Sequence, residues 1–528
     1  MRARENSSPD RDSTVSTALP AARLARIQQP WVLRIAALAV AFLAIRIFTA
    51  AIVAVPGYTD AYYYVSIAEH VARGDGLVAD FVWSPLEAPR LEDLPVPSNR
   101  FWMPLVSLVQ AAGIAALGGL LGPFRAAQLV SIVFAVLVPV ACYVAARSLG
   151  ANERWALLGA ALVGMGGLFL PAWVTLDSYG LAAIVGTIYF LALARAARGE
   201  SWWGAVAGSA VGALFLARAE GSILGLGLLA LVVSPRTRRA GLTGSAVALV
   251  VGAAWLARDS LLGGAGDVFA RSVLLVRYED LFALRGPTLD AFLANGADVM
   301  AAKLSALGSN AVTFLFAFAI LPVAGLVAGA RATWGRPEVR AFVGLAVAVY
   351  LAESVVWTLH STRGSYVHSL AAFLPFGFAI AAVGGQTLLA SASAPARGLA
   401  VAVAVAMCLV ISVAALAQFD PTFGASERSR RAAVDAIPAG PFLALDASAW
   451  HWIAGRPVIV TPSDGPDAAA CLAARYGARS LVLEAAHLGA YDALYASGGG
   501  VAWLDAPVDR GAIRIFPVRG DLVCATAR

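Results

Sequence analysis

Long apolar segments recur along most of this chain, and they constrain its fold more than any single motif. They stand at 31–55, 125–146, 155–173, 178–195, 202–217, 220–233, 241–257, 309–330, 341–358, 369–390 and 398–417. A helix of about 20 apolar residues crosses the hydrocarbon core of a bilayer. Because 59% of the residues are hydrophobic and the mean hydropathy is +0.74, a water-soluble fold could not bury this surface. We therefore expect a polytopic α-helical membrane protein with about 11 transmembrane helices.

Arginine clusters between these segments indicate how the chain is oriented. They occur at 147–154, 195–198, 236–239 and 331–340, with a further arginine at 397. Short loops rich in basic residues stay in the cytosol, so the N-terminus is expected inside and the C-terminus outside. The net charge of +6 thus reports orientation in a cell membrane rather than nucleic-acid binding. Residues 1–30 are polar and lack a signal-peptide cleavage pattern, which predicts a disordered cytosolic tail.

One further apolar segment, 103–121, is expected not to cross the membrane. A crossing there would place the arginines at 147–154 on the outer face. Pro104 and Pro123 bound the segment and it contains several glycines, so we expect a helix that lies in the interface or re-enters. The transmembrane domain then covers 31–419, with outer loops at 56–121 and 258–310.

The last part of the chain, 420–528, has a different pattern. Its apolar runs shorten to strand length at 442–445, 457–460, 480–483, 501–504 and 513–518, and helical stretches alternate with them at 447–453, 466–476 and 485–495. This alternation predicts a small extracytoplasmic α/β domain. Cys471 and Cys524 lie in it, where the oxidising compartment permits a disulfide, and two unpaired thiols are the alternative.

Charged side chains gather at the expected outer ends of the apolar segments. Asp60 directly follows the first segment and begins an amphipathic helix, where it either caps the helix or serves a function, since charge near hydrocarbon is costly. The others on this face are Asp177, Arg218, Arg258, Arg363 and His368. Singly, each could be an interfacial anchor, and Glu220 and Asp259 could neutralise two of the arginines. Together on one face, they favour a site.

These residue types suit the transfer of a group carried on a lipid phosphate. Arginines can make bidentate hydrogen bonds to a phosphate at the head-group level, and His368 could add a donor. A carboxylate such as Asp60 can take a proton from an attacking hydroxyl or amine. Tyr63, Trp83 and Trp102 offer apolar faces to a sugar ring or prenyl chain, although aromatic residues also line any membrane interface.

Several stretches resemble one family of membrane enzymes. They are DAYYY at 60–64, NRFWMPL at 99–105, RAEG at 218–221, YEDLF at 278–282, RGSYVHS at 363–369, GRPVIVTP at 455–462 and ARYGARSLVL at 474–483. With the order of spans and outer loops, they resemble the GT-C superfamily of integral-membrane glycosyltransferases. The branch that looks nearest is glycosyltransferase family 39, the dolichyl-phosphate-mannose protein mannosyltransferase-like proteins.

The resemblance implies a function and a set of roles. It implies a polyprenyl-phosphate sugar donor, a protein, lipid or glycan acceptor on the outer face, and inversion at the anomeric carbon. Asp60 matches the first-loop acid of the family, a base or metal ligand, and Asp177 matches its second acid. The second acid that usually accompanies the first-loop acid is absent beside Asp60. The need for a divalent metal is therefore left open, and no other cofactor is implied.

Two other classes of function remain as alternatives. A lipid-linked-sugar flippase or transporter would share the basic boundary, but it needs polar residues through the membrane depth, where Glu353 is the main candidate. An assembly protein whose tail binds a partner would leave Asp60 and Asp177 without a role. The glycosyltransferase therefore accounts for more of the residues, whereas the sugar, the acceptor and the oligomeric state are not specified by the sequence.

Overall fold

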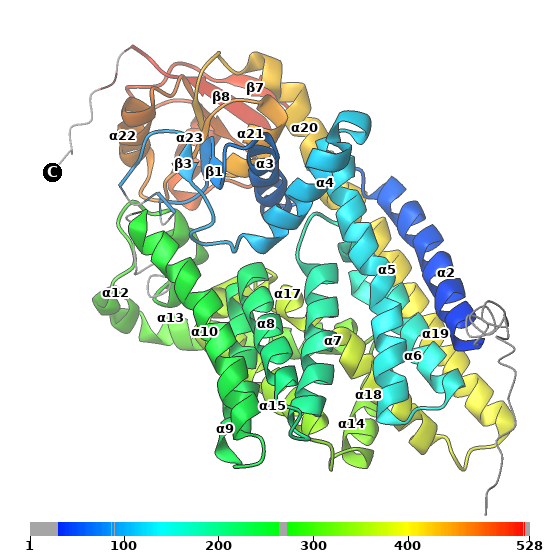
Figure 1. The fold of residues 1–528 in the computed structure, drawn as a ribbon. Coiled ribbons are helices and arrows are strands. Elements are labelled where there is room, and N and C mark those ends of the chain that lie inside the picture. The colour runs from blue at the N-terminus through cyan, green and yellow to red at the C-terminus, as the bar shows by residue number, and fades with distance from the viewer. Residues whose placement is uncertain (1–29, 86, 89, 263–271, 521, 523–528) are drawn as a thin grey trace, which may run out of the picture.

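The computed structural model describes residues 30–85, 87–88, 90–262, 272–520 and 522. The predicted tail at 1–30 lies outside the described residues except for its last residue, and so does Cys524, one of the two cysteines considered for a disulfide. The described chain is a bundle of long helices with a mixed β-sheet at one end (Figure 1).

The helices of the bundle are long and apolar. Seven segments of the described chain have the length and composition to cross a membrane. They contain α2 (Pro30–Ile52), α5 (Pro123–Leu149), α7 (Tyr179–Ala196), α10 (Arg238–Leu261), α13 (Gly296–Ala317), α15 (Pro337–Leu351) and α19 (Ala394–Ala417). Two bent pairs raise the number to nine, one pair being α6 (Glu153–Met165) with 167–174 and the other α17 (Ser365–Ala371) with α18 (Leu374–Leu388).

The predicted number of eleven crossings is not established by these helices. Two of the predicted crossings, at 202–217 and 220–233, correspond to the shorter apolar helices α8 (Trp202–Ala217) and α9 (Gly225–Val233). The segment at 103–121 forms α4 (Leu105–Leu121), which packs against α5 and against α3 (Thr59–Arg73). Its position in the membrane interface remains a prediction.

One predicted span is wrong in its boundaries. The segment 309–330 is not one helix, because α13 ends at Ala317 and α14 (Pro322–Ala332) begins anew. Ala319 and Ile320 adopt positive φ angles of 49° and 62° between them, and the Ile320 N–H donates to Leu315 O at 2.7 Å, which closes the end of α13. Because α13 already begins at Gly296, the outer loop predicted to reach residue 310 is shorter, and α10 extends into its start.

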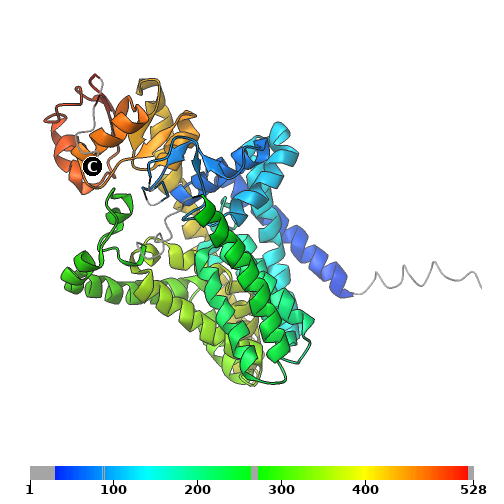
Figure 2. The ribbon, with the colours of Figure 1, turned by 60° about the vertical axis from the view of Figure 1, so that its left-hand side comes forward.

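The arginine-rich loops lie at the end of the bundle away from the sheet. Arg336 donates to Ser148 O at 3.0 Å, and Asn152 N donates to Gln386 Oε1 at 2.7 Å, so loops that are far apart in sequence meet there. Figure 2 shows the C-terminal segment and the first outer segment together at the opposite end. This separation is the one that the orientation argument requires, and the orientation itself remains a prediction.

The sheet has six strands in the order β2-β5-β4-β6-β8-β7. The strands are β2 (Phe81–Val82), β4 (Phe442–Ala444), β5 (Val458–Val460), β6 (Ser480–Leu483), β7 (Val508–Arg510) and β8 (Ile513–Pro517). The first four in the order are parallel, and β8 and β7 run antiparallel to their neighbours. Since β2 comes from the first outer segment, the C-terminal segment does not build its sheet alone.

Most predicted elements of the C-terminal segment are present. The strands at 442–445, 457–460, 480–483 and 513–518 are confirmed, but 501–504 makes only a single bridge between Leu504 and Val518. The helices α21 (Ala447–Ala454) and α22 (Pro466–Tyr476) are confirmed, whereas 485–495 forms a helix only later, as α23 (Asp492–Ser497). The boundary at 420 is not a linker, because α19 continues through a π turn into α20 (Ala425–Ala433).

Candidate active site

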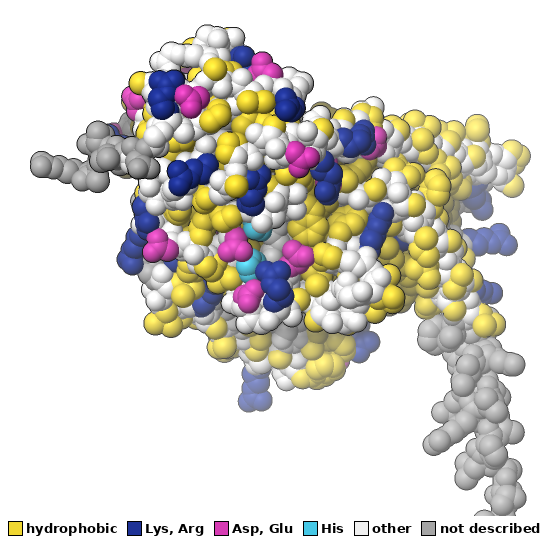
Figure 3. Space-filling view, turned by 90° about the horizontal axis from the view of Figure 1, so that it is seen from above, with side chains coloured by type: hydrophobic (Ala, Val, Ile, Leu, Met, Phe, Trp, Pro, Cys, Tyr) yellow, Lys and Arg dark blue, Asp and Glu magenta, His cyan; other side chains and the backbone are white. Residues whose placement is uncertain are grey.

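A cavity of about 1040 Å³ opens where the helical bundle meets the sheet. Its wall combines aromatic side chains with ionisable ones, and the ionisable ones come from both parts of the molecule. They include Asp60, Arg100, Arg218, Glu220, Asp259, Glu279, His360, Arg363, His368, Arg430, Asp446, Glu484 and His487. Figure 3, which looks onto this end of the molecule, shows acidic, basic and histidine side chains gathered near the middle of the face.

Asp60 lies in the cavity wall, in the first turn of α3. The residue that caps this helix is Tyr58, with no side-chain cap hydrogen bond, so the interpretation of Asp60 as a cap is wrong. One Asp60 carboxylate oxygen is 3.6 Å from Arg218 Nη1, and 22% of the side chain is exposed. Burial and the negative charge of Asp177 raise the pKa of Asp60, although His368 and Arg218 oppose the shift.

Asp177 lies behind the cavity wall rather than in it. Its side chain is fully buried and accepts hydrogen bonds from Tyr58 Oη at 2.9 Å and from Ser178 N at 2.5 Å. Its Oδ1 is also 3.3 Å from His368 Nδ1. Burial acts to raise the pKa of Asp177, but His368 and Arg218 outweigh it and lower that pKa. Asp177 is therefore held as a buried carboxylate against Tyr58, Ser178 and His368, and its predicted catalytic role stays a prediction.

His368 connects the two acids to an aromatic support. Its ring stacks on Tyr179 with centroids 4.5 Å apart, and Nε2 is 3.0 Å from Tyr179 Oη. The ligating atoms of His368, Asp60 and Asp177 all lie within 4.8 Å of one another. Two carboxylates and an imidazole can hold a divalent cation, so these three residues fit the metal that the sequence left open.

Arg218 is the cation closest to Asp60. It contacts Glu220 at 3.5 Å and Ser365 Oγ at 3.4 Å through Nη2. Its Nε and Nη1 atoms are buried and have no hydrogen-bond partner within the described part of the chain. Unsatisfied buried donors are costly, and a phosphate oxygen in the cavity would satisfy them.

The other two predicted phosphate ligands differ from each other. Arg258 lies outside the cavity wall, where it donates to Ser98 O at 2.9 Å and to Leu77 O at 3.4 Å. Its predicted phosphate contact stays a prediction, and its predicted neutralising partner Asp259 is instead 3.7 Å from Arg100. Arg363 is exposed at the cavity, with its guanidinium 5.0 Å from the ring centre of Tyr278.

Two of the three predicted aromatic contacts line the cavity. Trp83 and Trp102 form part of the wall and pack together with centroids 4.1 Å apart. Tyr63 lies outside the wall and is fully buried. Its hydroxyl donates to Glu87 Oε1 at 2.5 Å and accepts from Asn99 N at 2.6 Å. Tyr63 thus packs behind the aromatic wall, with its ring 4.5 Å from that of Trp102, and its predicted contact with substrate stays a prediction.

Sequence reasoning missed two groups of residues at this site. Tyr58 contacts Asp177, and Tyr179 contacts His368. Both tyrosines stand two residues from a predicted acid, Tyr58 from Asp60 and Tyr179 from Asp177, and this spacing could have indicated them. The second group comes from the C-terminal segment and consists of Arg430, Asp446 and Glu484, with Arg430 3.0 Å from Asp446 and 3.1 Å from Glu484. Only the packing of that segment over the bundle reveals this group.

Comparison with known proteins gives matches at the level of structure. No protein-family model matches the chain, and no curated protein matches it by sequence. ArnT from Cupriavidus metallidurans bound to undecaprenyl phosphate is similar over 93% of this chain and 98% of its own, with 16% identity and a TM-score of 0.55. The archaeal oligosaccharyltransferase AglB from Archaeoglobus fulgidus, in complex with an inhibitory peptide and a dolichol-phosphate, covers 84% and 69%, with 13% identity and a TM-score of 0.51.

The chain has a GT-C fold. This is the fold that the sequence stretches suggested, and it agrees with a multi-pass membrane protein. At 13–16% identity the similarity establishes the fold alone. The finer resemblance to glycosyltransferase family 39 remains a prediction.

Proposed function

We propose that this chain is a membrane glycosyltransferase that moves a sugar from a polyprenyl-phosphate donor to an acceptor on the outer face of the membrane. The observation that carries the proposal is the pairing of Asp60 with Arg218 in one cavity wall, their charged atoms 3.6 Å apart. This places a candidate base beside a candidate phosphate ligand. The GT-C fold supports the same class of reaction.

The donor phosphate is assigned to Arg218, with Arg363 at the cavity edge. Arg218 Nε and Nη1 are buried and make no hydrogen bond in the described structure, with Nη1 at ion-pair distance from Asp60, and an anionic group in the cavity would supply the acceptors. Two structures with the same fold contain undecaprenyl phosphate and dolichol-phosphate, which supports a polyprenyl-phosphate donor for this chain. Trp83 and Trp102 then offer apolar faces to the sugar or to the lipid chain.

The reaction follows from the positions of these residues. Asp60 takes the proton from an acceptor hydroxyl or amine, whose oxygen or nitrogen forms a bond to the anomeric carbon. The bond from that carbon to the phosphate oxygen breaks, and its electron pair leaves with the polyprenyl phosphate. Attack from the side opposite the phosphate inverts the anomeric carbon. Arg218 stabilises the charge on the departing phosphate.

Asp177 and His368 act as positioning residues in this scheme. Asp177 accepts from Tyr58, the residue that caps the helix of Asp60, and His368 stacks against Tyr179. A divalent cation held by Asp60, Asp177 and His368 would supply additional positive charge toward the phosphate. The proton transfer and the displacement are otherwise assigned to the side chains of the chain itself.

Reconstituted vesicles distinguish this function from a flippase or transporter. The purified chain is placed in liposomes with a radiolabelled polyprenyl-phosphate sugar, and envelope membranes supply acceptors. A transferase moves the label from the lipid into an acceptor fraction. A flippase instead leaves the label on the same lipid and only moves it to the other leaflet, and that result would overturn the proposal.

A further inference from the structure

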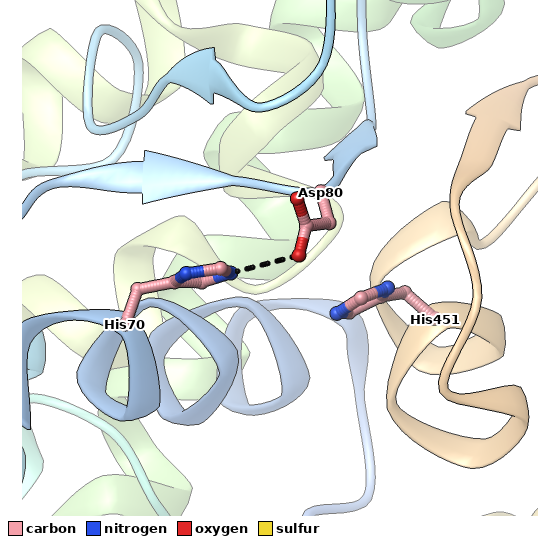
Figure 4. Close-up of side chains that lie close together, drawn as sticks. All are labelled: His70, Asp80 and His451. Carbon is pink, nitrogen blue, oxygen red and sulfur yellow. Dashed lines mark ion pairs between the residues drawn. The ribbon is translucent and has the colours of Figure 1, made fainter. Parts of the chain in front are cut away.

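A second cluster of metal-ligating side chains lies at the other end of α3 from Asp60. His70 stands near the end of α3, Asp80 lies between β1 (Val78–Ala79) and β2, and His451 belongs to α21 (Figure 4). Ten residues of helix separate His70 from Asp60, which is about 15 Å along the helix axis. None of the three residues lines the cavity, so the cluster is separate from the candidate active site.

The spacing of this cluster suits a small divalent cation. His70 Nε2 is 3.3 Å from Asp80 Oδ2, and the three residues each offer one ligand atom within 4.8 Å of the others. Tetrahedral ligands at about 2.0–2.1 Å from a zinc ion lie roughly 3.3 Å from one another. One edge of such a site is therefore already present, and a bound zinc ion would draw the three ligand atoms to this spacing.

The imidazole of His451 is held in the state that binds a metal. Its Nδ1 is 2.9 Å from Arg456 O, and because a carbonyl oxygen only accepts, Nδ1 carries the proton. The lone pair is then on Nε2. A hydrogen bond from the second ring nitrogen to a backbone carbonyl is the usual support of a metal-ligating histidine.

The imidazole of His70 can form two alternative hydrogen-bond arrangements. Its Nδ1 lies 3.1 Å from Asp75 Oδ2, which can only accept, and 3.1 Å from Arg73 Nη2, which can only donate. When Nδ1 donates to Asp75, Nε2 presents a lone pair beside Asp80, as in a carboxylate–histidine–metal arrangement. When Nδ1 accepts from Arg73, Nε2 instead donates to Asp80. A cation bound between the two imidazoles selects the first arrangement.

We propose that His70, Asp80 and His451 bind a zinc ion, with water as the fourth ligand. Two imidazoles and one carboxylate favour zinc over magnesium or calcium, which prefer all-oxygen sites. The ion would link α21 of the C-terminal segment to α3 and to the strand that joins its sheet. Less than one turn before His451, at the start of α21, Ser448 Oγ donates to Thr59 O at 3.1 Å. Zinc would thus complete the attachment of the C-terminal segment along the helix that carries Asp60.

Zinc content of the purified full-length chain tests this site. The protein is stripped with a chelator, reloaded with zinc, freed of excess by gel filtration and assayed for bound metal. His451→Gln and Asp80→Asn should each retain about one equivalent less than wild type. His487→Gln is the matched control, because His487 is in the same segment and pairs with Asp492 instead, and it should retain as much as wild type. Asp75→Asn should weaken zinc binding by about 10–100-fold.

Two further measurements make the outcome decisive. Asp177→Asn alters only the cluster of Asp60, Asp177 and His368 near the cavity. It should therefore keep the zinc ion at His70, Asp80 and His451, which His451→Gln loses. Added zinc should raise the melting temperature of the stripped wild type by more than that of Asp80→Asn, because Asp80→Asn leaves only the cluster of Asp60, Asp177 and His368 intact. This comparison can be made even if His451→Gln fails to fold. Equal zinc content in wild type and Asp80→Asn, or equal melting shifts, would overturn the proposal and leave only the ion pair between His70 and Asp80.

Discussion

At the scale of single residues, the proposed chemistry depends on the different surroundings of two acids. Asp60 is partly exposed in the cavity wall, and burial raises its pKa. Asp177 is enclosed by Tyr58, Ser178 and His368, and its pKa is lowered. Two nearby carboxylic acids whose pKa values are pushed apart by their environments commonly have different roles. Asp60 therefore suits proton transfer, whereas Asp177 stays charged and holds its neighbours.

The rate of transfer should depend on pH through Asp60. The base must be ionised, so the rate falls as pH decreases through the pKa of Asp60, which lies above the ordinary value of about 3.9. Arg218 lowers the pKa of Asp60, and Arg218→Gln should therefore move the acidic limb to higher pH. The measurement is kcat/KM against pH, with Arg258→Gln as a control that leaves the limb unchanged. Superimposable acidic limbs for wild type and Arg218→Gln would contradict this assignment.

The arginines should separate into binding and structural residues. Arg218→Lys loses the second of two parallel hydrogen bonds to the phosphate, which should weaken donor use by about 1.5–3 kcal/mol, or at least tenfold. Arg258→Lys should instead lower the melting temperature, because its partners are the backbone carbonyls of Ser98 and Leu77. Donor KM and thermal unfolding are measured for both variants. A larger donor defect in Arg258→Lys than in Arg218→Lys would reverse the assignment.

The sequence could predict part of this site because position along an apolar segment reveals depth and side. On that basis Asp60, Arg218, Arg363, His368, Trp83 and Trp102 were expected together, and all of them line the cavity. Depth does not reveal the direction in which a side chain points. Asp177, Arg258 and Tyr63 share the same end of the bundle but turn toward backbone or buried partners.

At the scale of elements, small residues explain how α8 and α10 pack. A Cβ atom at Gly204 would meet Ala240 O at 2.1 Å, and one at Gly208 would meet Gly244 O at 2.2 Å. The two backbones therefore touch along a row of residues spaced by four, as in helix pairs that associate within membranes. This packing secures a helix that is short for a membrane span.

Gly208→Ala should destabilise this helix pair. The added methyl group has to displace backbone, which should cost about 1–3 kcal/mol and lower the melting temperature of the purified protein. Gly252→Ala is the matched control, since Gly252 lies in the partner helix α10 and a Cβ atom there would meet nothing within 4 Å. If both variants melt at the same temperature, α8 and α10 do not pack as described.

The strands also show which elements periodicity and composition can predict and which they cannot. The strands β4, β5 and β6 were found because they are continuous apolar runs, as expected of buried parallel strands. β7 was missed because all three of its residues are exposed at the sheet edge, and β2 because it has only two residues. β2 joins the sheet by pairing with β5, which is far away in the sequence, and a local sequence pattern cannot predict such a pairing.

At the scale of the whole molecule, the cavity and the arginine-rich loops occupy opposite ends. A reporter that is active only outside the cytosol should therefore be active when inserted after Asn295 or Gly500, which lie in predicted outer segments. It should be silent after Gly199 or Gly335, which lie in the turns that carry arginines. Activity after Gly199 would invert the orientation and place the cavity in the cytosol.

The arrangement of the two ends was predictable from the sequence, but the union of the C-terminal segment with the first outer loop was not. The positions of the arginines and the lengths of the apolar segments are local properties of the sequence, and they determine how the chain is oriented in the membrane. The cavity, in contrast, requires Arg430 and Glu484 to meet a wall that begins near Asp60. That meeting is set by the sheet and by the packing of α21 on α3.

Release of polyprenyl phosphate from a polyprenyl-phosphate sugar tests the central claim most directly. Wild type and Asp60→Asn are incubated with the labelled donor and envelope membranes, with Glu69→Gln as a control on the same helix outside the cavity wall. We expect wild type and Glu69→Gln to release polyprenyl phosphate as the sugar reaches an acceptor. Asp60→Asn should remain folded and be slower by about a hundredfold or more. Release by Asp60→Asn at the wild-type rate, or no release by wild type, would contradict the account.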